Sequence, residues 1–291
     1  VPYRREPRCS FPEHSPREHG IDAPLSAPSH CTTVVSMGIL NGKNIVVTGV
    51  LTDASLAFGV AKLAQEEGAQ VALTGAGRGL SLTQRTARKL SAPAPVFEFD
   101  VTNDAHVVSV RDDVQKHFGH VDGVLHAIGF APAACLGDDL MAATWDDVSV
   151  AIQVSAFSLK TLADAFVPLM TNGGTIVGLD FDNTVAWPAY NWMGVAKSAF
   201  ESTNRYLARE LGPKGIRCNL VAAGPIRTMA AKSIPGFAKF EDVWDDRSPL
   251  GWDVNDGSVV AKTCVALMSD FFPATTGEMI HVDGGYHAIG A

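Results

Sequence analysis

Most of the chain alternates short apolar, β-branched runs with longer stretches in which apolar residues recur at helical spacing. The apolar runs fall at residues 44–48, 70–74, 96–99, 123–127, 175–179, 217–222 and 278–282. The helical spacing occurs at residues 56–67, 104–118, 147–170, 190–211 and 257–269. Buried apolar strands joined by helices are typical of a parallel sheet covered on both faces. The pattern predicts one α/β domain built on a doubly wound, seven-stranded parallel sheet.

The first 36 residues depart from this alternation. They are rich in proline and carry scattered acidic and basic residues, without apolar periodicity before Val34. Such a segment buries too little apolar surface to offset the entropy of ordering, so we expect a disordered extension at 1–36 and a folded domain at 37–291. The segment lacks the apolar core of a signal peptide, and its acidic residues argue against a transit peptide. An extension without function is favoured over a regulatory tail.

Charge and cysteine content narrow the function classes. The net charge of −8 and the isoelectric point near 5.5 argue against nucleic-acid binding, because phosphate neutralisation needs clustered lysine and arginine. We expect no membrane segment, since no apolar run approaches the roughly 20 residues that a spanning helix needs. The five cysteines form no CxxC pair and no histidine cluster has metal-ligand spacing, so we expect reduced thiols, no metal site and a cytoplasmic protein.

The turn after the first predicted strand is a candidate nucleotide site. Thr48 and Gly49 end this strand, and the next helix starts near Ser55 and Leu56, with its N-terminus at the strand's carboxyl end. Unpaired N–H groups at such a terminus bind phosphate, and the Ser55 hydroxyl can cap the helix and add a donor. The usual G-x-G-x-x-G pattern is absent, so a structural tight turn explains this segment as well as a nucleotide site does.

Three further strand ends belong to the same predicted edge of the sheet. Asp100 follows the third strand and can accept a hydrogen bond from an adenine amine, while Gly129 follows the fourth and permits close ligand approach. The glycine-rich loop 74–78 follows the second strand and lacks the carboxylate that commonly holds a ribose 2′-hydroxyl. Arg78 in this loop could reach a 2′-phosphate, but a solvated arginine is the commoner case. We therefore expect NAD(H) and keep NADP(H) open.

Tyr190 and Lys197 are a candidate catalytic pair on the helix predicted at 190–211. Seven residues correspond to about 700° of helical rotation, which places both side chains within about 20° of one face. A phenol can donate a hydrogen bond to a carbonyl oxygen that becomes negative during reduction, and a nearby cation can bind ribose hydroxyls. Taken alone, the pair is better explained as a boundary tyrosine and a surface lysine of an amphipathic helix.

Four segments resemble the short-chain dehydrogenase/reductase superfamily, and within it the divergent bacterial enoyl-acyl-carrier-protein reductases. They read TG at 48–49 with SLA at 55–57, IGF at 128–130, PAYNWMGVAKS at 188–198 and NLVAAGPIRT at 219–228. The resemblance extends over residues 37–291 and is strongest to the actinobacterial branch that serves long-chain and mycolic-acid precursors. It implies a Rossmann-type fold and a homotetramer.

A departure from the carbonyl-reducing members of this superfamily indicates the reaction. Those members place a tyrosine four residues before the lysine and a serine on the preceding strand. Here Met193 occupies the tyrosine position, and the strand ends in Asp180 and Phe181 without that serine. In the enoyl reductases the tyrosine lies one turn earlier, as Tyr190 does, and an aromatic residue occupies the position of Phe181. The resemblance therefore implies reduction of a C=C bond rather than of a ketone.

In that family NADH delivers hydride to the β-carbon of a trans-2-enoyl thioester, carried by acyl-carrier protein or coenzyme A. By resemblance, Tyr190 bonds the enolate oxygen and Lys197 holds the nicotinamide ribose. Phe181 takes part in hydride passage or forms a wall of the pocket, and Ala131 lies beside the substrate. The cofactor contacts that the resemblance implies are Gly49, Ser55, Leu56, Asp100, Val101, Ile128, Gly129, Val154, Lys197 and Ile226.

Residues 226–249 correspond to the substrate lid of the family. The segment lacks strong helix caps and carries several apolar residues, as expected of a lid over an acyl chain; these are Met229, Ile234, Phe237, Phe240 and Trp244. Core helices with surface loops are an equal alternative from the sequence alone. The segment is shorter than in members that take the longest chains, which leaves the acyl length open.

Two alternative activities stay open. The first is a short-chain dehydrogenase that acts on a keto or hydroxyl group. The second is a nicotinamide-binding regulator that keeps the fold without turnover. The presence of both Tyr190 and Lys197 argues against the regulator.

Overall fold

Seven strands form one sheet within the described part of the chain. The computed structural model describes residues 37–290, apart from the side chains of residues 233 and 238–242, so the prediction for residues 1–36 lies outside the described residues. The strands are β1 (Asn44–Val47), β2 (Gln70–Gly75), β3 (Val96–Glu98), β4 (Gly123–His126), β5 (Gly174–Asp180), β6 (Ile216–Ala223) and β7 (Met279–Val282). They pair in parallel in the order β3-β2-β1-β4-β5-β6-β7.

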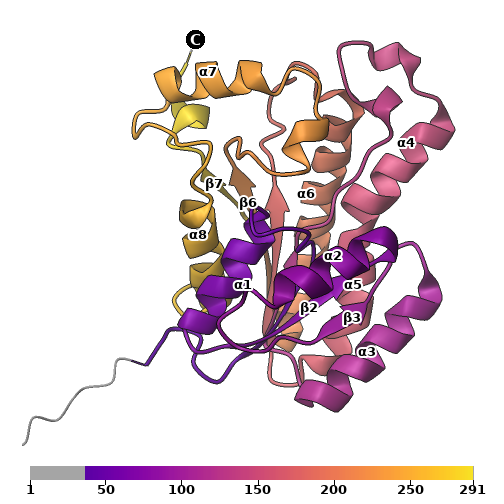
Figure 1. Ribbon diagram of the computed structural model, residues 1–291, viewed down its shortest axis with the longest axis vertical. Helices are drawn as coiled ribbons and strands as arrows, with labels where there is room; N and C mark the ends of the chain where they lie inside the picture. The colour runs from indigo at the N-terminus through magenta and orange to yellow at the C-terminus, as the bar shows by residue number, and fades with distance from the viewer. Residues whose placement is uncertain (1–36, 291) are drawn as a thin grey trace, which may run out of the picture. The chain divides into compact units, whose positions relative to one another are not determined.

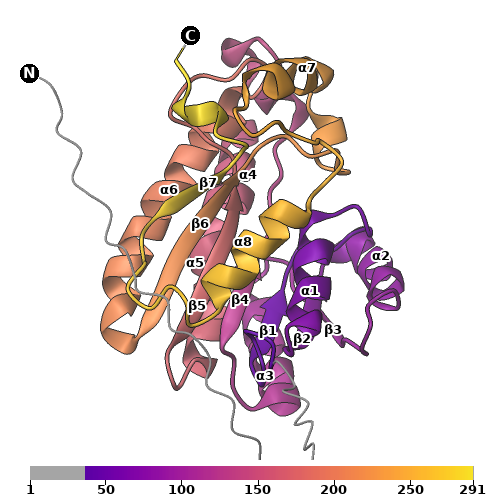
Figure 2. The ribbon, with the colours of Figure 1, turned by 90° about the vertical axis from the view of Figure 1, so that its left-hand side faces the viewer.

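Helices cover both faces of this sheet. They are α1 (Leu56–Glu66), α2 (Gly77–Ala87), α3 (Asp104–Phe118), α4 (Trp145–Ile152), α5 (Ser158–Phe166), α6 (Asn191–Leu211), α7 (Ala238–Arg247) and α8 (Ser258–Met268). Helices α1 and α8 lie side by side on one face, and α3, α5 and α6 pack on the other (Figure 2). Helix α7 lies beyond the carboxyl ends of the strands (Figure 1). The arrangement confirms the predicted doubly wound, Rossmann-type fold.

The alternation of side chains along β1 explains why its sequence is apolar at every central position. Ile45 and Val47 point into the core shared with α1 and α8. Val46, between them, points into the opposite core, which α3, α5 and α6 complete. All three side chains are fully buried. A strand whose two faces are both covered has no polar face, so it reads as a continuous apolar run rather than an alternating one.

The strand order creates a crevice at the centre of the sheet. β1 pairs with β2 on one side and with β4 on the other, so the chain crosses the sheet between β3 and β4. The connections that leave β1 and β4 consequently diverge toward opposite halves. At such a switch point, ligands bind outside the carboxyl ends of the strands. The candidate residues that follow β1 and β4 are therefore neighbours in space.

The single helix predicted at 147–170 is interrupted in the structure. Helix α4 is followed by a π-helical turn at Gln153–Phe157, then by α5 and by a 3₁₀ turn at Val167–Leu169. In the π-turn, the Ser155 hydroxyl accepts a hydrogen bond from the N–H of Phe130 at 2.9 Å and donates one to its carbonyl oxygen at 2.8 Å. Apolar periodicity does not reveal a π-turn, because the chain stays helical while its register shifts.

The helical run Trp145–Leu169 also corrects an expectation about membrane segments. By length and composition alone it could cross a membrane, so the statement that no segment approaches this length is wrong. In the structure, 56% of its most apolar window is buried. Leu159, Leu162 and Phe166 are fully buried against the sheet and its helices. This burial is that of a core helix in a globular domain.

Helix α2 is absent from the sequence-based prediction, which treated residues 74–78 as a loop. The strand β2 continues to Gly75, and α2 starts at Gly77, so Arg78 lies in a first helical turn and not in a loop. The helix attaches through hydroxyl groups. The Thr83 Oγ1 donates to the carbonyl oxygen of Val50 at 2.7 Å, and the Thr86 Oγ1 donates to that of Leu51 at 2.9 Å. The residues of α2 that are buried are Thr83, Thr86 and Ala87, so its sequence lacks the run of large apolar residues by which the other helices were predicted.

Candidate active site

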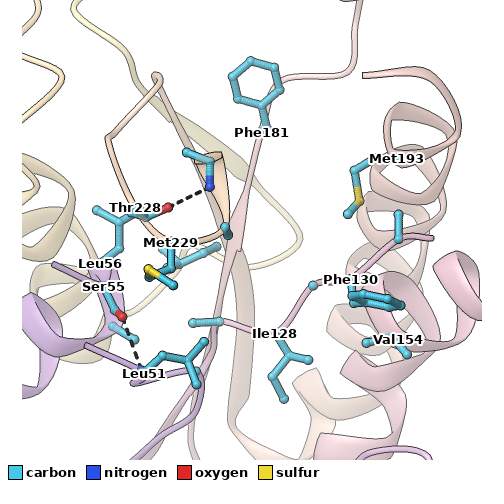
Figure 3. Close-up of a pocket in the computed structure, with 18 of the residues that line it drawn as sticks. Leu51, Ser55, Leu56, Ile128, Phe130, Val154, Phe181, Met193, Thr228 and Met229 are labelled. Atoms are coloured by element: carbon cyan, nitrogen blue, oxygen red, sulfur yellow. Dashed lines mark hydrogen bonds between the residues drawn. The ribbon is translucent and has the colours of Figure 1, made fainter. Parts of the chain in front are cut away.

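One cavity of about 770 Å³ opens at the carboxyl ends of the central strands. Ser55 and Leu56 lie on one side of it, and Phe130, Val154 and Met193 lie on the other (Figure 3). Every catalytic, cofactor-contacting and substrate residue that the family resemblance implies lines this cavity: Gly49, Ser55, Leu56, Asp100, Val101, Ile128, Gly129, Ala131, Val154, Phe181, Tyr190, Lys197 and Ile226. Their roles toward cofactor and substrate remain predictions. Among residues 37–290, no cluster of three or more His, Cys, Asp or Glu side chains is placed to hold a metal ion.

Gly49 forms the tight turn at the end of β1. Its φ is +78°, a left-handed conformation that residues with a Cβ rarely adopt. A Cβ at this position would lie 2.0 Å from the carbonyl oxygen of Ala127 at the end of β4. The turn therefore admits glycine alone, and its bare backbone faces the cavity. The ends of β1 and β4 therefore approach each other closely beside the cavity, and the anion cradle predicted at this turn stays a prediction.

Ser55 does not cap helix α1 as expected. Its hydroxyl oxygen accepts hydrogen bonds from the N–H groups of Leu51 at 3.3 Å and Thr52 at 3.0 Å, so it closes the loop that precedes the helix (Figure 3). The Ser55 side chain makes no cap bond to α1. In the first turn the Phe58 N–H donates to the Ser55 carbonyl oxygen at 2.9 Å, so the N–H groups of Leu56 and Ala57 are the ones available to an anion. The prediction of a cap was wrong, and the anion cradle at this helix terminus stays a prediction.

Asp100 follows strand β3 and lines the cavity. Its Oδ1 accepts hydrogen bonds from the N–H of Thr102 at 2.9 Å and from the Thr102 hydroxyl at 2.7 Å. The bond from this hydroxyl holds the pKa of Asp100 below its ordinary value. Asp100 therefore stays a carboxylate at neutral pH, and its free lone pairs can accept a hydrogen bond from an amine.

Lys197 is buried at the wall of the cavity, although its sequence context suggested a surface position when taken alone. Its Nζ donates a hydrogen bond to the carbonyl oxygen of Leu179 at 3.0 Å and lies 3.3 Å from Oδ1 of Asp180. It also lies 4.9 Å from the centre of the Phe200 ring. Contacts from β5 and from its own helix fix the ammonium at the place where β5 ends.

Asp180 is a site residue that the sequence reasoning missed. Its side chain is fully buried beside Lys197, and this burial raises its pKa to about 6 even though the ammonium favours the ionised form. The available signal was a charged residue at the end of an otherwise apolar strand. Charged side chains are seldom fully buried without a partner, so an aspartate at the end of a buried strand predicts a cation nearby.

Tyr190 lies just before helix α6 and not on it. Its neighbours Ala189 and Asn191 have φ values of +60° and +50°, so a strained turn, rather than helical rotation, directs the phenol into the cavity. The helical-face argument for the pair with Lys197 was therefore wrong in its geometry, although both side chains reach one cavity. Burial, with a smaller effect of the Asp180 charge, raises the pKa of Tyr190 above its ordinary value.

Phe181 forms the wall of the cavity beside Tyr190. Its ring centre lies 4.9 Å from that of Tyr190, in an edge-to-face arrangement, and it stands at the end of β5 across from Met193 (Figure 3). On its other side, Phe181 contacts Trp187 at 5.4 Å and Trp244 at 5.9 Å between ring centres. The structure thus bears out its contact with the cavity and leaves its part in hydride passage a prediction.

The segment predicted as a lid divides between two environments. Ile226, Met229, Ile234 and Phe237 line the large cavity. Trp244 is instead buried in a separate aromatic cluster and does not line that cavity, as the alternative of core helices with surface loops expected. The side chain of Phe240 lies outside the described residues. That this segment covers an acyl chain stays a proposal.

Comparisons with known proteins identify the family. Residues 49–287 match the family model described as enoyl-(acyl carrier protein) reductase. An NADH enoyl-acyl-carrier-protein reductase of Mycolicibacterium smegmatis is 50% identical, covering 85% of this chain and 97% of that protein. The enzyme of the same description from Mycobacterium avium is 48% identical with the same coverage, 85% and 97%. An NADPH enoyl-acyl-carrier-protein reductase of Staphylococcus aureus is 37% identical, covering 86% of this chain and 98% of that protein. These matches confirm the expectation from the sequence: the chain belongs to the enoyl-acyl-carrier-protein reductase family.

Proposed function

We propose that this protein reduces the C2=C3 bond of trans-2-enoyl thioesters in fatty-acid elongation, with NADH as the electron donor. The observation that carries the proposal is a buried phenol and a buried ammonium, Tyr190 and Lys197, at the wall of one large cavity. Met193 lines that cavity at the place where carbonyl-reducing relatives carry their tyrosine. Family membership supports the reaction class, and the matched segment includes all of these residues.

The cofactor is proposed to lie along the carboxyl ends of β1, β3 and β4. The bare backbone at Gly49 and the uncapped N-terminus of α1 fit a pyrophosphate, and the carboxylate of Asp100 fits an adenine amine. NADH, when bound, supplies the hydride that C3 of the substrate receives. The mycobacterial relatives named above are NADH enzymes, which supports NADH over NADPH.

NADPH is the second candidate, because the Staphylococcus aureus relative described above carries that cofactor in its name. Arg78 in the exposed first turn of α2 is the cation closest in sequence to the end of β2, where a ribose 2′-phosphate would be read. Titrating the protein with NADH and NADPH separately tests the preference. We expect tighter binding of NADH, and a lower Kd for NADPH would reverse the assignment.

Tyr190 is proposed to stabilise the charge that develops on the thioester oxygen. Since its pKa is raised, the phenol keeps its proton at neutral pH and can act as a donor. Hydride addition to C3 moves electrons through C2 onto the carbonyl oxygen and forms an enolate. A hydrogen bond from the Tyr190 hydroxyl strengthens as this charge grows, which is the condition for lowering the barrier.

Lys197 is proposed to position the nicotinamide ribose. One of its three ammonium donors is used on the carbonyl oxygen of Leu179, and Asp180 lies beside it, so the ammonium is oriented before any ligand arrives. A preorganised cation loses little entropy when it binds hydroxyl groups. Asp180 acts through Lys197 and is therefore a positioning residue in this proposal.

The proposal extends to the carrier and the assembly. We propose that acyl-carrier protein or coenzyme A carries the acyl group, and that the chain works as a cytoplasmic homotetramer without nucleic acid or membrane. The net charge of −8 supports the exclusion of nucleic acid. Light scattering after size-exclusion chromatography is expected to give four times the chain mass of 30.8 kDa. A mass of one or two chains would contradict the tetramer.

Substrate panels separate the proposed function from its alternatives. Purified protein is mixed with NADH and either trans-2-enoyl or 3-ketoacyl thioesters, and cofactor oxidation is followed by absorbance. Oxidation with the enoyl substrate is the expected result. Oxidation with the keto substrate only would establish a carbonyl reductase, and cofactor binding without turnover of any substrate would support the regulator.

A further inference from the structure

A second, smaller cavity of about 310 Å³ lies behind the wall of the large one. It is bounded by the segment that precedes Tyr190 and by the segment proposed as the lid. Its lining residues include Trp187, Pro188, Ala189, Pro235, Trp244 and Tyr286. None of these six residues lines the large cavity. The two spaces are therefore neighbours with separate walls.

The partition between the cavities consists of Phe181 on one side and two tryptophan rings on the other. Phe181 lines the large cavity, whereas Trp187 and Trp244 line the small one, and the Phe181 ring contacts both indoles. The backbone alternates in the same way: Ile234 and Phe237 face the large cavity, and the residues between them face the small one. Likewise, Tyr190 lines the large cavity and its neighbour Ala189 lines the small one.

Hydrogen bonds hold the indoles of the partition in place. The Trp187 Nε1 donates to the carbonyl oxygen of Asp182 at 2.6 Å, and the Trp244 Nε1 donates to that of Asp283 at 3.1 Å. Trp244 also stacks on Tyr286, with ring centres 3.9 Å apart and planes 13° from parallel. Large rings anchored at both faces and at their N–H groups make a rigid wall.

The place of this wall matters for an acyl chain. With the thioester oxygen at Tyr190 and the cofactor along the strand ends, the rest of the acyl group is left with the apolar side of the cavity. Met193, Ile234 and Phe237 line that side together with the Phe181 ring, whose centre lies 4.9 Å from that of the Tyr190 ring. A chain that grows in this direction meets the partition.

We propose that Trp187 sets the upper limit of acyl length, because it packs behind the Phe181 ring and holds that ring in place as the wall between the large cavity and the small one. The inference rests on the proposed function and names the substrate class of that site: enoyl thioesters whose chain ends at the aromatic partition. Each further methylene that finds apolar surface raises kcat/KM about fourfold, and this gain stops where the chain meets the wall. The small cavity is the space that a longer chain would enter once the wall is opened.

The test compares chain-length profiles of the wild type and of Trp187→Ala. The kcat/KM values are measured for trans-2-enoyl coenzyme A substrates from four to twenty carbons, each with saturating NADH. We expect the profile of the wild type to rise and then break, and we expect the break of Trp187→Ala to lie at least two carbons higher. A break at the same length in both proteins would overturn the proposal.

Three controls keep the result specific. Trp187→Phe retains a ring in the partition and should leave the break unchanged. Val243→Ala widens the small cavity at a lining residue that is not one of the partition rings, and should also leave the break unchanged. Trp187→Leu shortens the side chain but keeps it apolar, so it serves if Trp187→Ala fails to fold. A shifted break in Val243→Ala would contradict the role of the wall.

A binding measurement separates this inference from the proposed reaction. Saturated acyl coenzyme A thioesters of the same lengths are titrated into each variant by calorimetry, which requires no turnover. If enoyl thioesters are not reduced but the break in Kd still moves in Trp187→Ala, the proposed function fails and the wall stands. If reduction occurs and neither break moves, the wall fails and the function stands.

Discussion

At the scale of single residues, burial decides the chemistry of the candidate site. The structure buries three polar side chains there, those of Tyr190, Lys197 and Asp180. On a protein surface, side chains of these types are ordinary. Removing water raises the pKa of the phenol and of the carboxyl group, and it strengthens every electrostatic contact that remains. The proposed division of labour, with Tyr190 as donor and Lys197 as cofactor holder, follows from these environments.

Replacing Tyr190 by Phe removes one hydroxyl and keeps the ring against Phe181. We expect kcat to fall by about 10²–10³, equivalent to about 2.7–4 kcal/mol, because one donor to the developing oxyanion is lost. The Kd for NADH, measured by fluorescence titration, should change by less than about twofold. An unchanged kcat would show that the phenol takes no part in the barrier.

Asp180 gives the protein a pH-dependent stability with a defined sign. Because its pKa is raised by burial to about 6, the folded protein holds this proton more tightly than the unfolded chain does. The native state therefore binds more protons between the ordinary carboxyl pKa and pH 6, and this group makes stability fall as pH rises through that window. Asp180→Asn removes the group, so its stability should decline less than that of the wild type over the same window.

Urea unfolding at several pH values across this window measures that difference. Asp138→Asn, at an exposed position, is the control and should keep the wild-type dependence on pH. Equal slopes for the wild type and Asp180→Asn would contradict the account of a buried carboxyl group. In the same variant, a raised KM for NADH at constant pH would further support the positioning of Lys197.

At the scale of elements, the ends of strands and helices shape the site. Gly49 ends β1 where a Cβ would collide with Ala127, and Ser155 in the π-turn holds the backbone of Phe130 in two hydrogen bonds. Both residues act on loops that follow neighbouring strands. The shape of the cavity therefore depends on two junctions, the turn at Gly49 after β1 and the hydrogen bonds from Ser155 to the loop after β4.

Gly49→Ala tests the first junction. The substitution combines a positive φ with a 2.0 Å contact to the Ala127 carbonyl oxygen, so β1 and β4 must separate at the cradle. Gly42→Ala is the matched control, because Gly42 has a φ of +75° and open space at the Cβ position. We expect both variants to lose about 1–2 kcal/mol from the backbone conformation. Only Gly49→Ala should also lose NADH binding, and equal NADH affinities would contradict the cradle.

Ser155→Ala tests the second junction. The N–H and the carbonyl oxygen of Phe130 each lose a partner, which costs about 1–3 kcal/mol of unfolding free energy when the groups are buried. Ser149→Ala removes an exposed hydroxyl bonded to the Asp146 carbonyl oxygen at 2.8 Å and should cost far less. Thermal unfolding of both variants checks the difference. A loss in Ser155→Ala no larger than in Ser149→Ala would show that the π-turn does not hold the loop.

The same junctions explain what could be predicted at this scale. Buried strands such as β1 and β4 are visible as apolar runs, and the residues at their ends could be named as site residues. The apolar pattern did not predict helix α2, the π-turn or the turn around Tyr190. They depend on hydroxyl hydrogen bonds and on positive φ angles at Ala189 and Asn191, which leave no periodic trace in the sequence.

At the scale of the whole molecule, topology joins residues that are far apart in sequence. Gly49, Asp100 and Gly129 line one cavity because parallel strands place all their carboxyl ends at one edge of the sheet. This regularity made the candidate site predictable from strand positions. It could not reveal the partition, since Phe181 and Trp187 belong to the connection between β5 and α6, whereas Trp244 belongs to helix α7.

The central claim, hydride transfer to C3 of an enoyl thioester, has a direct test. NADH carrying deuterium at the transferred position is mixed with the protein and a trans-2-enoyl thioester, and the saturated product is examined by mass spectrometry and NMR. The account predicts one deuterium at C3 and a solvent-derived proton at C2. A product with deuterium at C2 or at a carbinol carbon, or with none at C3, would contradict it.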